Sequence, residues 1–355
     1  MTTIISFVVV LGVLIFAHEL GHFIFAKIFG VKVEEFGFGY PPRIFAKKFK
    51  GTTYSLNIIP FGGFCSLKGV VGDDRCINDT SHVEKNSFLG KKAWQKFFIL
   101  AGGILFNFVF YLAVFTIIFS VGTNYYLNDL PKGAKIINRD PGIFVYNVVD
   151  GYPAISAGLK AGDVIYEVDG VKIETQKQFS AYNQERGEGS IVTLKTSNGD
   201  KQIALAKINT SEVGIGVELV ETGRIIMNPI RAFIFSVKQA GFVIKEVARI
   251  LLELLKGSVP QEIGGPVAIA KISGIVASEG IIPLLLFTAL LSLNLAVVNF
   301  LPFPGLDGSH LFILAVESII RRPLNKRIEA IVHQVGMALL VLLLILVTIR
   351  DIKRF

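Results

Sequence analysis

Two histidines and a glutamate near the start of the chain have the types and spacing of a metal-dependent hydrolytic site. The sequence His-Glu-Leu-Gly-His occupies residues 18–22. On a helix, residues four apart lie on one face, so His18 and His22 can bind the same zinc ion at about 2.0–2.1 Å. Glu19, on the adjoining face, can then act as the general base toward a water molecule.

The hydrophobic surroundings of this motif are unusual for a soluble metal site. Between Ile4 and Ala17 the only residues that are not apolar are Ser6 and Gly12, and residues 23–26 continue the hydrophobic run. Ionisable groups at membrane depth are costly, and they usually serve a function. The alternative is a chance match on a buried helix of a soluble protein, in which neighbouring side chains satisfy the three polar groups.

The composition predicts a membrane protein that crosses the bilayer several times. Of its 355 residues, 52% are hydrophobic and 18% are charged, which is apolar for a soluble chain. The net charge of +8 therefore indicates cytoplasmic loops and contact with lipid headgroups. No arginine cluster with interleaved aromatic residues indicates a nucleic-acid partner. Cys65 and Cys76 are predicted to be free thiols, because two cysteines form no disulfide framework.

Four hydrophobic segments reach the roughly 20 residues that a helix needs to span the hydrocarbon core. The predicted spans are residues 1–30, 97–122, 281–308 and 330–350. Lysine and arginine concentrate in residues 31–96 and in the loop 309–329, which favours a cytoplasmic position for both. The termini, including the tail 351–355, and the long central segment are then predicted to lie outside the cytoplasm.

The segments between the spans have their own predicted structure. Residues 31–96 contain β-rich runs broken by glycine and proline. They indicate either a β-hairpin that re-enters the membrane beside protein or an ordinary cytoplasmic hairpin. Residues 225–280 are predicted to form amphipathic helices on the membrane surface, or helices packed on the preceding domain.

Residues 125–224 are predicted to hold a small extracytoplasmic α+β domain. Short strands alternate with turns at Asp169-Gly170 and Asn198-Gly199, and two short helices fit between them. The fragment at residues 153–170 closely resembles a PDZ domain, predicted at about residues 133–208. Such a domain offers a strand edge and a groove to an extended peptide.

A third metal ligand has to come from elsewhere in the chain, because catalytic zinc sites usually have three protein ligands. Asp307 is the best candidate, since it closes the third hydrophobic run. Pro302 and Pro304 interrupt the helix just before it, as occurs where backbone lines a cavity inside the membrane. An acid at the end of a helix is the alternative interpretation of Asp307.

Residues 18–22 and the sequence Asn-Phe-Leu-Pro-Phe-Pro-Gly-Leu-Asp-Gly at residues 299–308 together resemble the paired signature of the site-2 protease family. With one PDZ insert, the chain is similar to the regulator-of-sigma-E type of intramembrane zinc protease. The resemblance extends to residues 37–39, 60–64 and 264–271. Two departures are visible: one PDZ domain stands where the better-known enterobacterial member has two, and Asn107 of the Gly-Pro-x-x-Asn motif is present without its proline.

This resemblance implies a polytopic α-helical membrane protein with a membrane-associated β-hairpin and one PDZ domain. It implies a zinc endopeptidase in which His18, His22 and Asp307 hold Zn²⁺ and Glu19 moves protons. The substrate would be a single-pass membrane protein, already cut by another protease and then cleaved in or near its transmembrane helix. Anti-sigma factors and remnant signal peptides are the two classes suggested.

Several other residues are predicted to contact the substrate. Asn299 is the candidate to hold its backbone or the developing oxyanion. Asn294 either orients the peptide or forms a hydrogen bond between helices. Tyr54, Gly62 and Gly63 lie in the β-rich run 54–64, which can pair with an extended peptide by strand addition.

The predicted location is the bacterial cytoplasmic (inner) membrane, with the active site toward the cytoplasm. Two other functions fit parts of the sequence. A catalytically idle scaffold would act through the PDZ domain and would tolerate the loss of Glu19. An ion-coupled transporter would relay ions through His18, Glu19 and Asp307, but it predicts a second, related repeat, and the sequence has no internal symmetry.

Overall fold

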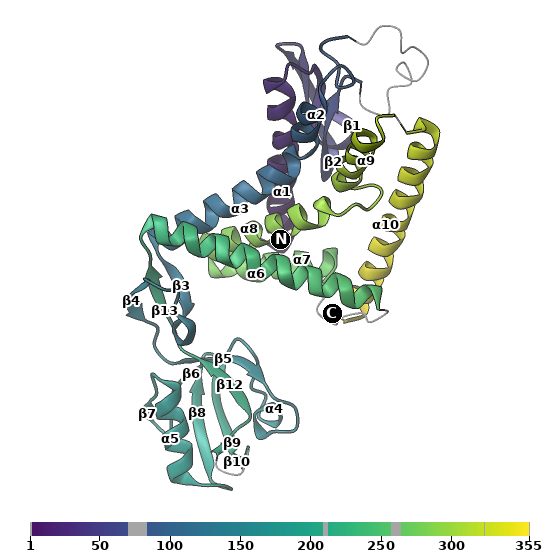
Figure 1. Cartoon of the computed structure of the whole chain (residues 1–355). Coiled ribbons are helices and arrows are strands. Elements are labelled where there is room, and N and C mark those ends of the chain that lie inside the picture. The colour runs from purple at the N-terminus through teal and green to yellow at the C-terminus, as the bar shows by residue number, and fades with distance from the viewer. Residues whose placement is uncertain (1, 70–83, 209–211, 257–263, 323, 355) are drawn as a thin grey trace. The chain divides into compact units, whose positions relative to one another are not determined.

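The computed structural model describes residues 2–69, 84–208, 212–256, 264–322 and 324–354. They form two compact units: Met1–Phe115 with Ser236–Phe355, and Thr116–Phe235. Figure 1 shows helices and a small β-sheet in the first unit and mainly β-structure in the second. Cys65 is a free thiol, as predicted, whereas Cys76 lies outside the described residues.

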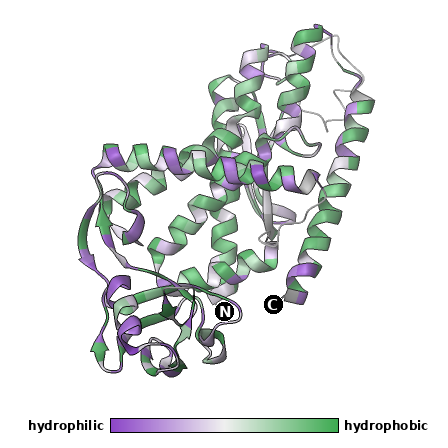
Figure 2. Ribbon diagram, turned by 60° about the horizontal axis from the view of Figure 1, so that its bottom comes forward, coloured by the Kyte–Doolittle hydropathy of each residue, from purple (hydrophilic) through white to green (hydrophobic). Residues whose placement is uncertain are grey.

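Among the described residues, four helices are long and apolar enough to cross a membrane, which agrees with the prediction. They are α1 (Thr2–Ile28), α3 (Gly102–Val121), α8 (Ile281–Phe300) and α10 (Lys326–Arg354). Figure 2 shows hydrophobic residues along nearly all of α10, whereas α6 (Pro229–Leu255) carries a mixture of hydrophobic and polar residues. A helix pairs its backbone groups internally, so it suits such apolar segments.

The helices do not coincide everywhere with the predicted segments. Around residue 97 the structure has two helices, α2 (Ala93–Leu100) and α3, separated at Ala101. Helix α8 ends at Phe300, before the two prolines. The predicted loop 309–329 is largely a helix, α9 (Asp307–Ile320). The predicted tail is helical up to Arg354, as part of α10.

Helices do form in the predicted region 225–280, as α6 and α7 (Pro266–Glu279). Helix α7 packs along α1, where Thr3 lies against Gly274. The carboxylate of Asp351, in α10, accepts hydrogen bonds from the backbone N–H groups of Gly265 (2.8 Å) and Ala268 (3.0 Å). It therefore satisfies donors that a helix start leaves unpaired.

The β-rich run near the N-terminus forms β1 (Val33–Phe49) and β2 (Thr52–Leu67), which pair antiparallel. Both strands bend, so residues 35–38 pair on one side with residues 53–56 and on the other with residues 63–66. Residues 43–49 pair with residues 52–57 on the side opposite residues 35–38. The 63–67 segment is therefore an edge, with no described strand on its other side.

The second unit holds the small α+β domain that the sequence predicts. Its main sheet has the order β12-β5-β6-β8-β9, with β7 paired to β6, and a three-stranded sheet has the order β3-β13-β4. The strands are β3 (Thr123–Tyr126), β4 (Lys135–Arg139), β5 (Ile143–Val148), β6 (Val164–Val168), β7 (Val171–Lys172), β8 (Ile191–Thr196), β9 (Gly199–Ala204), β10 (Ala206–Lys207), β11 (Val213–Gly214), β12 (Val217–Val220) and β13 (Thr222–Ile226). The last strand of the main sheet, β12, lies beyond residue 208, where the PDZ domain was predicted to end.

The core and turns of this unit follow from the alternating pattern of its strands. Residues Val145, Ile165, Val192 and Leu194 are fully buried between the sheet and two helices, α4 (Pro153–Ser156) and α5 (Gln176–Arg186). The predicted turn at Asp169-Gly170 is present, and both residues have positive φ angles (48° and 83°), as a two-residue hairpin turn requires.

Helix α1 approaches the start of α3 so closely that only glycine fits between them. A Cβ atom on Gly21 would overlap the carbonyl oxygen of Gly102, and one on Gly102 would lie 2.6 Å from the carbonyl oxygen of Gly21. The pair therefore brings two backbones into direct contact.

Gly21→Ala is expected to lower the free energy of unfolding by roughly 1–3 kcal/mol, because the added methyl group forces two helices apart. Gly241→Ala is the matched control in α6, where a Cβ atom would meet nothing within 4 Å. That control should change stability by less than about 1 kcal/mol, in the stabilising direction. Thermal unfolding of the detergent-solubilised chain, followed by circular dichroism, measures both; equal effects would contradict the close approach.

Candidate metal centre

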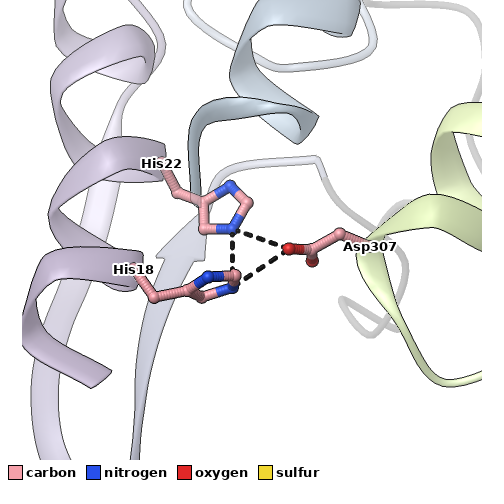
Figure 3. A group of neighbouring side chains, drawn as sticks. All are labelled: His18, His22 and Asp307. Carbon is pink, nitrogen blue, oxygen red and sulfur yellow. Dashed lines mark hydrogen bonds and ion pairs between the residues drawn. The ribbon is translucent and has the colours of Figure 1, made fainter. Parts of the chain in front are cut away.

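The structure brings the three predicted metal ligands together although 285 positions separate His22 from Asp307. His18 and His22 project from one face of α1, and Asp307 is the first residue of α9 (Figure 3). The Nε2 atoms of His18 and His22 lie 3.0 and 3.3 Å from Oδ2 of Asp307, and 3.4 Å from each other. Ligands about 2.0–2.1 Å from a tetrahedral zinc ion are about 3.3–3.4 Å apart.

The Asp307 oxygen offers an independent test of whether these residues fit a metal ion. Its Oδ2 atom is buried and makes no hydrogen bond with any described residue, although two imidazole nitrogens lie within 3.3 Å. This geometry is expected when the lone pairs of the two imidazole nitrogens and of the carboxylate oxygen all point to one common centre and no proton lies between them. A buried oxygen without a donor is unfavourable, and a cation between the three ligand atoms satisfies it. The residues therefore fit zinc.

The ring orientation of His22 is fixed by the break in the second span. Its Nδ1–H donates a hydrogen bond to the backbone carbonyl oxygen of Ile99, at 2.8 Å. That carbonyl belongs to the last turn of α2, and the helix ends at Ala101. With the proton on Nδ1, the lone pair of Nε2 faces the metal position, which is how outer hydrogen bonds select the tautomer of a zinc ligand.

Asn107, in α3, orients the other histidine. Its side-chain amide lies 3.1 Å from Nδ1 of His18, and the residue is fully buried. A histidine that binds metal through Nε2 carries its proton on Nδ1 and must donate it. The atom placed at this distance is the amide nitrogen Nδ2; with metal bound through Nε2 the amide would be turned to present its oxygen to His18 Nδ1–H, because the oxygen and nitrogen of an amide are assigned from their hydrogen bonds. The sequence singled out Asn107 without giving it a role.

Gly103 also belongs to the centre, and the sequence analysis did not assign it a site role. A Cβ atom there would lie 2.5 Å from Nε2 of His22 and 2.5 Å from Cε1 of His18. Any side chain at this position would displace the imidazoles. The sequence does mark this position, because Gly102 and Gly103 form a glycine pair inside an otherwise hydrophobic segment. Glycine is expected where a backbone or a ligand approaches closely.

Glu19 lies beside the ligand group but is not part of it, as its predicted role requires. The backbone N–H of Cys65 lies near its carboxylate. Cys65 belongs to the edge segment of β2. Glu19 therefore lies between the candidate metal ligands and the unpaired edge of the sheet.

The predicted substrate-contact residues divide into two groups. The Asn299 amide nitrogen lies 3.5 Å from Nε2 of His18, and a Cβ atom on Gly63 would lie 3.2 Å from Cγ of Glu19. Both residues are at the centre. Asn294 has a buried Oδ1 atom without a hydrogen-bond partner among the described residues, so the alternative of a bond between helices through that oxygen is not observed.

Tyr54 and Gly62 lie elsewhere on the sheet. The Tyr54 ring packs against Phe23 and Phe36, with ring centres 6.1 and 6.3 Å apart. Its backbone is paired with strands on both sides. Gly62 faces the ring of Tyr40. Only residues 63 and 64 of the predicted run belong to the 63–67 edge, which has no described strand on its other side.

Comparison with known sequences assigns the chain to a family. The profile described as Peptidase family M50 matches residues 6–343. The chain belongs to peptidase family M50. With its four long apolar helices, this M50 protein is a multi-pass membrane protein.

Relatives of this M50 chain match it over nearly their whole length. A Clostridium perfringens protein is 33% identical over 96% of this chain and 95% of its own length, and a Fusobacterium nucleatum protein is 32% identical over 99% and 98%. Both carry the provisional name of zinc metalloprotease. The PDZ domain of an SdrC-like protein from Listeria monocytogenes is 30% identical, over 22% of this chain and 88% of its own, with a TM-score of 0.21.

Asn107→Leu is expected to weaken zinc binding at this centre by roughly 10- to 100-fold, because it removes the acceptor for His18 Nδ1–H without changing the volume much. Asn107→Asp keeps an oxygen acceptor and should remain within about tenfold of the wild type. Competition with a chromophoric chelator measures both affinities. Equal losses in the two variants would show that volume, rather than the hydrogen bond, matters at this position.

Proposed function

We propose that this protein is a zinc endopeptidase that hydrolyses a peptide bond in or near the transmembrane helix of single-pass membrane substrates. The observation that carries the proposal is the convergence of His18, His22 and Asp307 at 3.0–3.4 Å. Two of the three lie on a helix long and apolar enough to span a membrane. Membership of family M50 and the names of the relatives support the same activity.

The catalytic roles follow from the positions of the side chains. His18, His22 and Asp307 would hold a zinc ion, which would act as the Lewis acid for water and for the scissile carbonyl group. Glu19 takes a proton from the attacking water and returns it to the leaving amine. Asn299, at 3.5 Å from His18, donates a hydrogen bond to the substrate carbonyl oxygen as negative charge develops.

The substrate backbone is proposed to pair with the 63–67 edge of β2. The N–H of Cys65 in this edge already faces Glu19, so a peptide beside the edge lies next to the base. An extended peptide satisfies its backbone groups by adding a strand to such an edge. The buried Oδ1 of Asn294 is a further acceptor that a substrate N–H can reach in this arrangement.

The proposed setting is the bacterial cytoplasmic membrane, in contact with lipid. The termini and the PDZ domain are placed outside and the metal centre toward the cytoplasm, on the basis of the basic residues in the loops. The substrates are proposed to be anti-sigma factors or remnant signal peptides that another protease has already cut. The PDZ domain is then positioned to bind the new C-terminus or to exclude large ectodomains.

The two rival functions account for less of the site. An idle scaffold needs no carboxylate beside the ligands, yet Glu19 lies there, with Gly63 of β2 against its side chain. An ion-coupled transporter does not require three ligand atoms at the spacing of a tetrahedral ion, nor the support of His18 by Asn107. The arrangement therefore favours hydrolysis.

Glu19→Gln is expected to reduce cleavage of a co-expressed single-pass substrate by about 10²- to 10⁴-fold, because it removes the proton acceptor. Bound zinc should be unchanged, since Glu19 is not a ligand. The control is Glu279→Gln, at the exposed end of α7, which should retain full activity. If cleavage persists in Glu19→Gln and in the wild type treated with a zinc chelator, the proposed zinc protease activity is refuted.

Cys65→Pro and Cys65→Ser separate the role of the edge backbone from that of the side chain. Proline removes the N–H that faces Glu19, whereas serine keeps it. We expect cleavage to fall about tenfold or more in the proline variant, as for one lost hydrogen bond to a charged group. The serine variant should stay near wild type, and zinc content should not change in either. Equal cleavage rates in the proline and serine variants would show that the β2 edge takes no part in catalysis.

A further inference from the structure

The second half of β1 and the turn after it, residues 43–50, form a surface whose character changes along its length. All of these residues are exposed. Ile44 and Phe45 at its start are 61% and 60% exposed, and three lysines follow: Lys47, Lys48 and Lys50. We propose that residues 43–50 bind anionic phospholipids, with the lysines on the headgroup phosphates and the apolar side chains among the acyl chains. This lipid site goes beyond the proposed protease function and does not depend on it.

The sheet formed by β1 and β2 runs beside the apolar helix α1 (Figure 1). The ring centre of Phe36 lies 5.1 Å from that of Phe23, and a Cβ atom on Gly12 would lie 3.1 Å from Cζ of Phe38. Because a helix rises about 1.5 Å per residue, Gly12 is about 24 Å from the end of α1 at Ile28. Since α1 is long and apolar enough to cross a membrane, Phe38 lies at membrane depth.

The strand register puts Phe45 at the same depth as Phe38. Phe45 pairs with Leu56, and Leu56 pairs on its other side with Phe38. Neighbouring strands are about 4.7–4.9 Å apart, so these three residues lie side by side across the sheet. Leu56 is itself 45% exposed. The apolar end of residues 43–50 therefore presents hydrophobic surface at membrane depth, where acyl chains can cover it.

The basic end of residues 43–50 lies at the last turn of α1. Phe49 pairs with Thr52, and Oγ1 of Thr52 accepts a hydrogen bond from Nζ of Lys27 at 2.7 Å. Lys27 belongs to the last turn of α1, and lysines at the ends of spanning helices reach the headgroup region. Lys47 and Lys48 lie on opposite faces of the strand, and their long side chains can extend to the same level.

The pairing of charges also separates the two ends. Arg43, at the apolar end, is neutralised, because its Nη2 atom lies 2.8 Å from both carboxylate oxygens of Glu35. No carboxylate among the described residues pairs in this way with the three lysines. The unneutralised positive charge therefore gathers at the headgroup level, where it complements the phosphates of anionic lipids. An acidic protein segment would match the charge but would leave the apolar end uncovered.

Lipid selectivity of the full-length protein, reconstituted in phosphatidylcholine vesicles, tests the proposal. Electron paramagnetic resonance of spin-labelled phosphatidylglycerol and phosphatidylcholine measures the fraction of each lipid held at the protein surface. We expect the wild type to prefer phosphatidylglycerol by about threefold or more at low salt. The triple variant Lys47→Gln, Lys48→Gln, Lys50→Gln should lose at least about half of that preference, because neutral amides replace the charges that attract the phosphates.

Two matched triple variants serve as controls. Arginine at the same three positions keeps the charge and should keep the preference. The variant Lys160→Gln, Lys177→Gln, Lys207→Gln removes the same charge from exposed positions of the second unit and should also keep it. A wild type without preference overturns the proposal, even if it binds an acidic peptide. Equal losses in the two glutamine variants overturn it as well.

A second measurement tests the depth of the two ends. Trp94 is the only tryptophan in the chain, so Trp94→Phe gives a background in which one new tryptophan reports its own position. Lipids brominated deep in the acyl chain should quench Phe45→Trp more strongly than Phe49→Trp. Equal quenching overturns the proposed arrangement. Neither measurement involves peptide cleavage, so failure of the lipid site and failure of the protease function are distinguished.

Discussion

The contact between α1 and the start of α3 is the constraint on which the metal centre depends. Gly21 and Gly102 allow the two backbones to touch, and Gly103 leaves room for the imidazoles beside them. This contact brings α3 close enough for Asn107 to support His18, and it brings the end of α2 close enough for the Ile99 carbonyl to support His22. A wider approach between the helices would leave two metal-binding rings without fixed tautomers.

The third ligand depends on a second close contact. Gly308 packs against the carbonyl groups of Phe300 and Leu301, so α9 turns back directly onto the end of α8. Gly336 in α10 packs against Pro304 from the other side. The short proline-containing loop between α8 and α9 is therefore held from both sides, and Asp307 begins α9 at a fixed position relative to α1. A small buried cluster joins the start of α3 to α8 and α9: Ala101, Ile104, Ala296 and Leu311.

Much of this arrangement could be predicted from local sequence. The His-Glu-x-x-His spacing, the hydrophobic lengths of the spans and the turn residues of the central domain are short-range signals, and the structure places His18, His22 and Asp307 together. The break at Ala101 could not be predicted in this way, because no proline marks it. Helix α9 lies mostly within the segment 309–329, which its basic residues favour as a cytoplasmic loop, and its 14 residues are too few to span a membrane. Its stability comes from packing on α2 and α8.

The supporting residues were harder to identify because their roles exist only in three dimensions. Asn107 is 89 positions from His18, and no sequence spacing indicates that the two side chains meet. The pairing of residues 35–38 on both sides, which leaves 63–67 as the edge, depends on bends within β1 and β2. A pattern of alternating residues predicts strands but does not specify their neighbours.

The unpaired 63–67 edge has a consequence for selectivity under the proposed function. An edge strand binds main-chain groups, and those groups are the same in every protein. A helical segment already uses its N–H and C=O groups internally, so it cannot pair with the edge until that helix opens. Discrimination among membrane proteins would then rest less on side-chain identity than on the free energy of opening one or two helical turns. Segments that contain glycine or proline would be favoured, because those residues weaken a helix.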